Sequence, residues 1–145
     1  MSLGEGRTGL KVLVVEDETL VCMMIEDMLL DLGCTLIGPA SDFEKALALA
    51  GEALIDVAIL DVNLDGIRSE PVADRLSARG VPLVFATGYG RDGISERYQN
   101  APVLKKPFTE REMRRALAEV LAAPVADDKR DGDLVPEEAS NPRDK

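Results

Sequence analysis

Short apolar runs alternate with helical patterns about five times between residues 10 and 122. Parallel strands that are buried on both faces read as near-continuous apolar runs, and the helices between them cover the two faces of the sheet. The alternation therefore predicts an α/β fold in which five βα units build one parallel sheet. We expect its strands at 10–15, 35–38, 57–60, 81–86 and 101–104.

The helices are expected at 18–32, from 41 onward, at 69–78, at 91–100 and from 109 onward. Capping-box patterns at Ser41 to Glu44 and at Thr109 to Glu112 predict where the second and fifth helices begin. The segment 91–100 has little apolar periodicity, so we expect its helix to be short or mobile. In the first helix, the 3.6-residue period predicts a buried face made of Leu20, Val21, Met24, Ile25, Met28, Leu29 and Leu32.

The length of 145 residues predicts one domain at 10–123, between a flexible N-terminus at 1–9 and a disordered acidic tail at 124–145. A net charge of −10 opposes binding to phosphate backbones, so we expect no contact with nucleic acid. No apolar run approaches the roughly 18 residues of a membrane span, and the first residues do not resemble a secretion signal. With only Cys22 and Cys34, the protein is expected in the reducing cytoplasm, with no membrane contact.

Polar side chains follow four of the expected strands at their carboxyl ends, where open parallel sheets bind ligands. They are Glu16 and Asp17 after the first strand, Asp61 after the third, Thr87 after the fourth, and Lys105 and Lys106 after the fifth. Clustered carboxylates repel one another, and hard oxygen ligands of this kind suit Mg²⁺. A lysine and a threonine hydroxyl at the same rim suit phosphate oxygens, so Asp61 is a candidate nucleophile toward phosphorus.

Each of these residues also has a simpler interpretation. Carboxylates at 16–18 are favoured by the dipole at a helix N-terminus, and a residue such as Asp61 is able to cap a turn. Thr87 and a Lys-Pro pair are ordinary loop residues when each is taken alone. Their joint occurrence at four matching strand ends favours a single phosphoryl site instead.

Four motifs, in order and spacing, resemble the receiver domain of two-component response regulators over residues 11–122. They are Val14-Val15-Glu16-Asp17-Glu18, Leu60-Asp61-Val62-Asn63-Leu64, Ala86-Thr87-Gly88 and Lys106-Pro107-Phe108. The resemblance implies a doubly wound, flavodoxin-like (βα)5 fold with strand order 2-1-3-4-5. The stretch from Pro82 to Tyr89 is similar to the FAT GUY subgroup of receivers, apart from Leu83, where phenylalanine is usual.

The resemblance also implies a role for each matching residue. Asp61 becomes the phosphoacceptor, Asp17 a direct Mg²⁺ ligand, Glu16 a ligand through water, Asn63 a ligand through its backbone carbonyl, Thr87 the switch hydroxyl and Lys106 the partner of the phosphate, with Lys105 as its neighbour. Gly88 and Tyr89 are the implied modulators of the switch loop. Val103 stands where many receivers carry an aromatic side chain that swings inward on activation, so the usual threonine–aromatic coupling is not available.

A receiver domain is a regulatory protein rather than an enzyme. The implied phosphodonor is a histidine kinase or a histidine phosphotransfer protein, which agrees with the absence of histidine from this chain. Because residues 123–145 hold no effector domain, we expect a single-domain response regulator that signals by protein contact near its fourth and fifth helices. The alternatives are a phosphate sink or relay intermediate for a shared kinase, a receiver that acts without phosphate, and an aspartate-nucleophile phosphohydrolase. The last needs a second acid where Asn63 stands.

Overall fold

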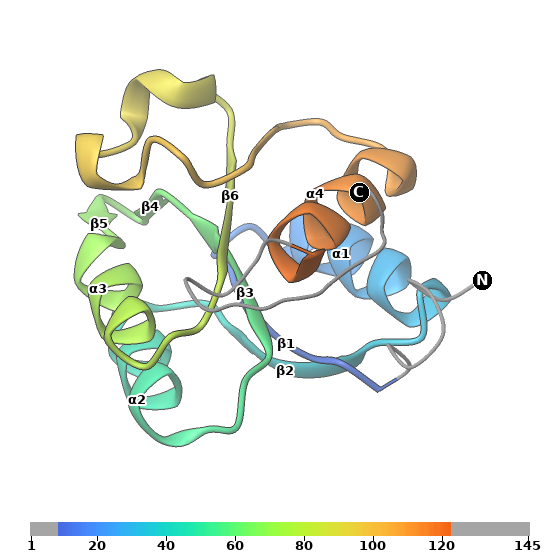
Figure 1. Ribbon diagram of the computed structural model, residues 1–145. Coiled ribbons are helices and arrows are strands. Elements are labelled where there is room, and N and C mark those ends of the chain that lie inside the picture. Colours follow the sequence, from blue (N-terminus) through green and yellow to red (C-terminus); the bar gives the residue numbers. More distant parts are fainter. Residues whose placement is uncertain (1–8, 123–145) are drawn as a thin grey trace.

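The computed structural model describes residues 9–122 (Figure 1). The larger elements are β1 (Lys11–Val15), α1 (Thr19–Asp31), β2 (Thr35–Ala40), α2 (Phe43–Glu52), β3 (Val57–Asp61), α3 (Glu70–Ala78), β6 (Leu83–Thr87), β7 (Val103–Lys105) and α4 (Glu110–Ala122). Four short elements complete the chain, namely β4 (Asn63–Leu64), β5 (Ile67–Arg68) and the 3-10 turns η1 (Gly90–Gly93) and η2 (Glu96–Tyr98). The expected tail at 124–145 and nearly all of the expected flexible N-terminus lie outside the described residues.

The main sheet has five strands in the order β2-β1-β3-β6-β7, and every neighbouring pair is parallel. Counted among the sheet strands alone, this is the order 2-1-3-4-5 that was expected. The strands begin or end within about two residues of the expected positions, which is the usual uncertainty of such bounds. The α/β fold with a parallel sheet is therefore confirmed.

Helices cover both faces of the sheet, with α2 and α3 on one side and α1 and α4 on the other (Figure 1). Strand β1 shows why an apolar run is needed: Leu13 and Val15 pack on the α2–α3 side, whereas Val12 and Val14 pack on the α1–α4 side. Successive side chains of a strand point to opposite faces, so a strand that is covered twice is apolar at every position.

The buried face of α1 differs from the expected one. Leu20 is 76% exposed and Met24 is 40% exposed, whereas Cys22 is buried beside Ile25 and Leu29. At about 100° per residue, positions 20 and 24 point away from the stripe defined by 22, 25 and 29. The expectation was wrong for Leu20 and Met24, and an apolar surface is left on the outer side of α1.

The two expected capping boxes had different outcomes. At α4 the box is confirmed, because the backbone N–H of Thr109 donates to Glu112 Oε1 at 2.8 Å and the N–H of Glu112 donates to Thr109 Oγ1 at 3.1 Å. At α2 it was wrong, because Asp42 and not Ser41 is the N-cap, accepting from the N–H of Lys45 at 2.8 Å. Asp42 has extended backbone angles and the helix begins one residue later than expected.

Two segments depart from regular βα connections. The segment 91–100, expected as a short or mobile fourth helix, forms only the two 3-10 turns η1 and η2, so the expectation of one helix there was wrong. Its weak apolar periodicity gives a longer helix no face to bury. After β3, where only a loop was expected, β4 and β5 pair antiparallel through the turn Asp65-Gly66. Both turn residues have positive φ, 50° and 89°, as a two-residue type I′ hairpin requires.

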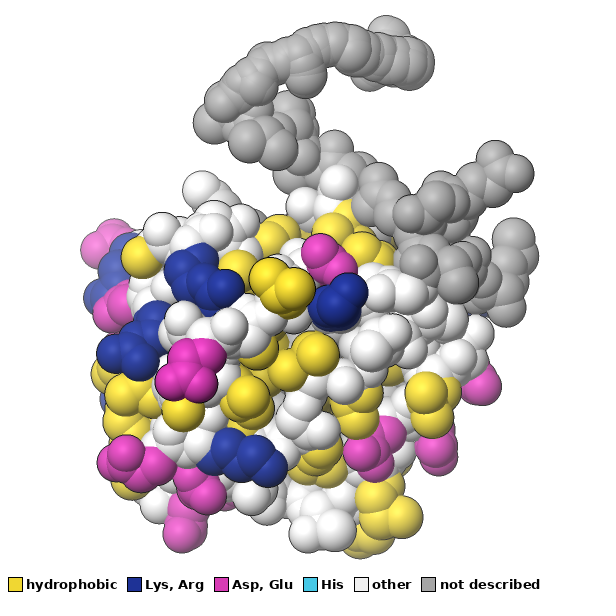
Figure 2. Space-filling model, turned by 90° about the horizontal axis from the view of Figure 1, so that it is seen from below, with side chains coloured by type: hydrophobic (Ala, Val, Ile, Leu, Met, Phe, Trp, Pro, Cys, Tyr) yellow, Lys and Arg dark blue, Asp and Glu magenta, His cyan; other side chains and the backbone are white. Residues whose placement is uncertain are grey.

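On the face shown in Figure 2, acidic and basic side chains are interspersed with apolar ones. Within residues 9–122, no helix combines the length and the apolar character that crossing a bilayer requires.

Candidate functional site

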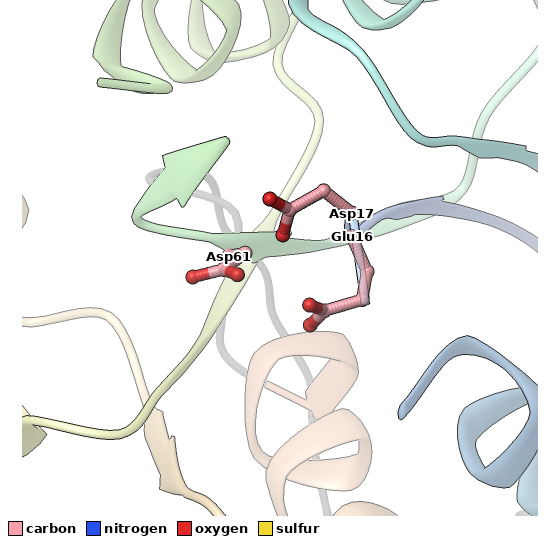
Figure 3. Close-up of side chains that lie close together, drawn as sticks. All are labelled: Glu16, Asp17 and Asp61. Carbon is pink, nitrogen blue, oxygen red and sulfur yellow. The ribbon is translucent and has the colours of Figure 1, made fainter. Parts of the chain in front are cut away.

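Three carboxylates converge at the carboxyl ends of β1 and β3. Glu16 and Asp17 directly follow β1, and Asp61 is the last residue of β3. The two strands are parallel neighbours with Val15 opposite Leu60, so their ends lie at the same edge of the sheet. One carboxylate oxygen from each residue lies within 4.8 Å of the other two, and Figure 3 shows the three side chains gathered at this edge.

A single ammonium group lies against these carboxylates. Lys106 Nζ is 2.7 Å from Glu16 Oε1, 3.2 Å from Asp61 Oδ2 and 3.5 Å from Glu18 Oε1. The backbone N–H of Lys106 donates to the carbonyl of Thr87 at 2.9 Å, which ties the residue after β7 to the end of β6. Lys105, by contrast, is exposed. The structure thus places Lys106, and not its neighbour, at the site.

Glu16 is the most enclosed of the three acids, with a side chain that is 1% exposed. Its Oε2 accepts the N–H of Glu18 at 3.2 Å. Its Oε1 is in charge contact with Lys106, but no donor reaches this oxygen with hydrogen-bond geometry. Burial raises the pKa of Glu16 to about 7; the nearby ammonium of Lys106 opposes the rise and the charge of Asp61 adds to it.

Thr87 ends β6 and is 1% exposed. Its Oγ1 accepts the backbone N–H of Tyr89 at 3.1 Å, which leaves the hydrogen of the hydroxyl available to another acceptor. Gly88 is exposed, and Tyr89 is 81% exposed, so the two residues that were expected to modulate a switch loop lie on the surface.

The β4–β5 hairpin holds two of the acids by backbone groups. The N–H of Asn63 donates to Asp61 Oδ1 at 3.3 Å, and the N–H of Asp65 donates to Asp17 Oδ2 at 2.8 Å. The side chain of Asn63 accepts the N–H of Gly66 at 2.7 Å and so closes the turn. The sequence interpretation missed these contacts, although an Asp-Gly pair flanked by apolar residues is a recognised hairpin signal.

Most of the expected site residues line one open cleft. They are Asp17, Asp61, Asn63, Thr87, Gly88, Tyr89 and Lys106, joined by Arg68 and Gly93, which carried no signal in the sequence. Glu16 lies buried beside this group. Val103 lies elsewhere, opposite Phe85 in the β6–β7 pairing and packed on the α2–α3 side of the sheet.

The donor set fits a small hard cation. Three residues supply carboxylate oxygens within 4.8 Å of one another, and one of the acids has a buried oxygen, Glu16 Oε1, without a hydrogen-bond donor. Mg²⁺ prefers such oxygen ligands and commonly takes one or two carboxylates together with waters. The three carboxylates can therefore hold a cation next to Asp61. The ammonium of Lys106 and the residue Thr87 lie at the same cleft.

Comparison with known proteins identifies the family. Residues 12–118 match the family described as the response regulator receiver domain. The chain belongs to this family. Receiver domains are regulatory proteins of two-component systems rather than enzymes; phosphorylation on aspartate is general among them, and they bind Mg²⁺ at an acidic pocket.

Individual relatives agree with this assignment. The transcriptional regulatory protein PdtaR of Mycobacterium tuberculosis is 33% identical over 105 residues, which are 68% of this chain and 50% of PdtaR. The chain thus spans about half the length of this curated relative. The solution structure of SdrG from Sphingomonas melonis is 45% identical with a TM-score of 0.72, over 83% of this chain and 99% of SdrG.

A third relative bears on the metal. The receiver domain of a sensor histidine kinase from Pseudomonas aeruginosa is 25% identical, with a TM-score of 0.64 over 80% of this chain and 100% of that one. Its structure has a magnesium ion coordinated in the active site cleft.

Proposed function

We propose that this receiver domain accepts a phosphoryl group on Asp61 from a phosphohistidine of a histidine kinase or histidine phosphotransfer protein. The observation that carries the proposal is the convergence of Asp17, Asp61, Thr87 and Lys106 on one cleft, with Glu16 beside it. Asp17, Asp61 and the backbone carbonyl of Asn63 would hold Mg²⁺, and Glu16 would reach it through water. The magnesium ion in the relative from Pseudomonas aeruginosa supports this assignment.

The transfer is a displacement at phosphorus. A carboxylate oxygen of Asp61 forms the new P–O bond while the P–N bond of the donor breaks. The electron pair of the broken P–N bond stays with the imidazole nitrogen of the donor. Mg²⁺, when bound, supplies positive charge that screens the approaching phosphoryl oxygens. Lys106 is already 3.2 Å from Asp61 Oδ2, and its ammonium can move to a phosphoryl oxygen once that carboxylate is phosphorylated.

The surface beside the site supports a protein as the phosphodonor. Helix α1 starts at Thr19, directly after the acidic segment, and its outer side exposes four large apolar side chains: Leu20, Met23, Met24 and Leu30. Exposed apolar patches of this kind mark protein–protein contacts. The imidazole that the chemistry requires is absent from this chain, so it must come with that protein.

Phosphorylation is proposed to pull Thr87 and Lys106 toward the phosphate and to shift the loop at 88–90 together with η1. A downstream protein would then read the face near η1, η2 and α4, without contact with nucleic acid or membrane, in the cytoplasm. The net charge of −10 supports a protein partner over a nucleic acid. The protein would act through this contact, or through removal of phosphate from a shared kinase.

Labelling with a small phosphodonor tests the central step. With acetyl phosphate and Mg²⁺, the wild type should gain the mass of one phosphoryl group, and Asp61→Asn should gain none. Asp65→Asn is the matched control, because it removes a cleft carboxylate that has no proposed role in the transfer, and it should label like the wild type. An unlabelled wild type, or label on Asp61→Asn, would refute the proposal.

The output is tested separately. Proteins that bind the phosphorylated form should be compared for binding to Asp61→Asn and to the unphosphorylated wild type. Binding to the phosphorylated form alone supports signalling by contact. Equal binding to all three supports the phosphate sink or relay intermediate.

A further inference from the structure

Three polar side chains are buried in the described part of the chain, namely Glu16, Ser69 and Thr87. Glu16 and Thr87 already belong to the candidate site. Ser69, which is 0% exposed, stands between β5 and α3 and has no role in the function proposed above. A buried hydroxyl must be hydrogen-bonded to offset its loss of water, so its partners show what it holds in place.

The hydroxyl of Ser69 points back to the phosphoacceptor strand. Its Oγ lies 2.5 Å from the backbone carbonyl oxygen of Asp61 and 3.1 Å from that of Val62. The backbone N–H of Ser69 also donates to the carbonyl of Val62, at 2.9 Å. One residue thus holds the main chain at the phosphoacceptor and at the residue that follows it.

This orientation differs from the one that its position in the chain favours. Ser69 is the N-cap of α3, where a serine oxygen normally accepts an N–H from the first turn of the helix. No such bond is made here. The start of α3 therefore lacks the stabilisation that an N-cap serine usually gives, and the hydroxyl is hydrogen-bonded to the carbonyls of Asp61 and Val62 instead.

We propose that Ser69 is a positioning residue for phosphoryl transfer to Asp61, a role that rests on the function proposed above. By holding the carbonyls of Asp61 and Val62, the hydroxyl fixes the direction in which the Asp61 side chain leaves the strand. It also fixes the start of the segment whose next member, Asn63, donates its N–H to Asp61 Oδ1. Reaction rates depend steeply on such alignment, because a carboxylate must meet phosphorus in line with the leaving group.

Two substitutions separate a hydrogen-bonding role from simple packing. Ser69→Ala removes the donor, and Ser69→Cys keeps a side chain of similar size but with a weak donor. Initial rates of phosphorylation would be measured by intact mass with acetyl phosphate at saturating Mg²⁺, so that metal affinity does not enter. We expect both variants to be about tenfold slower than the wild type, the factor expected when a hydrogen bond that aligns a reacting group is lost.

Asp42→Ala is the matched control for stability. It removes the N-cap hydrogen bond of α2 to the N–H of Lys45, on a helix that contributes no residue to the cleft. It should therefore lower stability by about the amount that a lost helix cap costs and leave the rate unchanged. All variants would be compared at a temperature at which circular dichroism shows each to be folded.

The outcomes are distinct. A wild-type rate for Ser69→Ala would overturn the positioning role, and a wild-type rate for Ser69→Cys with a slow Ser69→Ala would show that packing alone matters. If Ser69→Ala does not fold, the rates of Ser69→Cys and Asp42→Ala are compared instead. A slow Ser69→Cys beside a wild-type rate for Asp42→Ala supports the positioning role, and a wild-type rate for Ser69→Cys overturns it. An unlabelled wild type would instead overturn the proposed function itself.

Discussion

The ammonium nitrogen of Lys106 lies 2.7 Å from Oε1 of Glu16, a carboxylate that is 1% exposed. Lys106 is itself only 15% exposed and also contacts Asp61. Burial works to lower the pKa of Lys106, but its close contacts with Glu16 and Asp61 and the charges of both acids outweigh this, so the pKa is raised. Lys106 is therefore a cation that offsets the repulsion among these acids.

Removal of this cation should destabilise the protein in the absence of metal. Lys106→Met leaves Glu16 buried without a counter-charge, and we expect a loss of about 2 kcal/mol in the free energy of unfolding. Mg²⁺ should restore part of the loss, because it supplies the missing positive charge. Urea unfolding with a chelator and with Mg²⁺ measures both effects.

Lys105→Met is the control for this substitution. Lys105 is exposed and adjacent in sequence, so its replacement should change the free energy of unfolding by less than about 0.5 kcal/mol. Equal stability of the two methionine variants in chelator would show that the contact with Glu16 contributes nothing.

The pH dependence of stability should report the titration of Glu16. Its pKa rises from 4.5 to about 7 on folding, mainly through burial, so between these values the folded state binds more protons than the unfolded state. The stabilisation from this group is fully present below about pH 4.5 and is lost as the pH rises through about 7. In chelator, Glu16→Gln should reduce the fall in stability between pH 5 and pH 8, measured by urea unfolding. An identical pH profile for wild type and variant would contradict the prediction.

The hairpin turn should require glycine at position 66 for backbone reasons alone. Gly66 has φ of +89° and a β-carbon there would meet no atom within 4 Å, so Gly66→Ala adds strain without a clash. We expect a loss of about 1 kcal/mol in the free energy of unfolding. Gly88 is equally open but does not have a positive φ of this kind, so Gly88→Ala should be neutral or slightly stabilising. Thermal unfolding in chelator compares the two, and equal losses would refute the explanation.

The parallel sheet was predictable because its central strands β1, β3 and β6 are buried on both faces and so read as nearly unbroken apolar runs. The buried face of α1 was not, because apolar residues surround this helix almost completely from Leu20 to Ile25. The 3.6-residue period alone could not show whether Cys22 or Met24 faces the core. Which of the two is buried depends on how α1 packs on the sheet. The N-cap of α2 was equally ambiguous in the sequence, since Ser41 and Asp42 are neighbours and both are good N-cap residues.

The polar residues at the strand ends could be picked out from the sequence, and the structure places most of them at one cleft. The support around them was not predictable in the same way. Ser69 reads as an ordinary N-cap, and only the path of the chain from Asp61 through the hairpin brings its hydroxyl onto the carbonyl of Asp61. Asp65-Gly66 was a visible signal for the hairpin, but its contact with Asp17 depends on the turn lying over the end of β1.

One carboxylate ties η2 to α3. Asp74 accepts hydrogen bonds from Arg97 Nε at 3.0 Å, from Arg97 Nη2 at 2.9 Å and from the hydroxyl of Tyr98 at 2.5 Å. These bonds lower the pKa of Asp74, with the bond from Tyr98 as the largest cause. The ring of Tyr98 packs against Phe85 of β6 at 5.6 Å between centroids. Tyr98 therefore connects the strand of Thr87 to this surface, although position 103 has no aromatic ring.

Loss of this carboxylate should loosen η2 while the sheet stays intact. In Asp74→Ala, the amides of Tyr98, Gln99 and Ala101, which donate within this segment, should exchange with solvent several-fold faster. Tyr98→Phe removes only one of the three bonds and should give a smaller effect. Asp56→Ala is the control, because Asp56 is also exposed and accepts a hydrogen bond, but from Lys11 at the start of β1. Hydrogen exchange followed by NMR measures these rates, and unchanged exchange in Asp74→Ala would show that η2 is held by its apolar contacts alone.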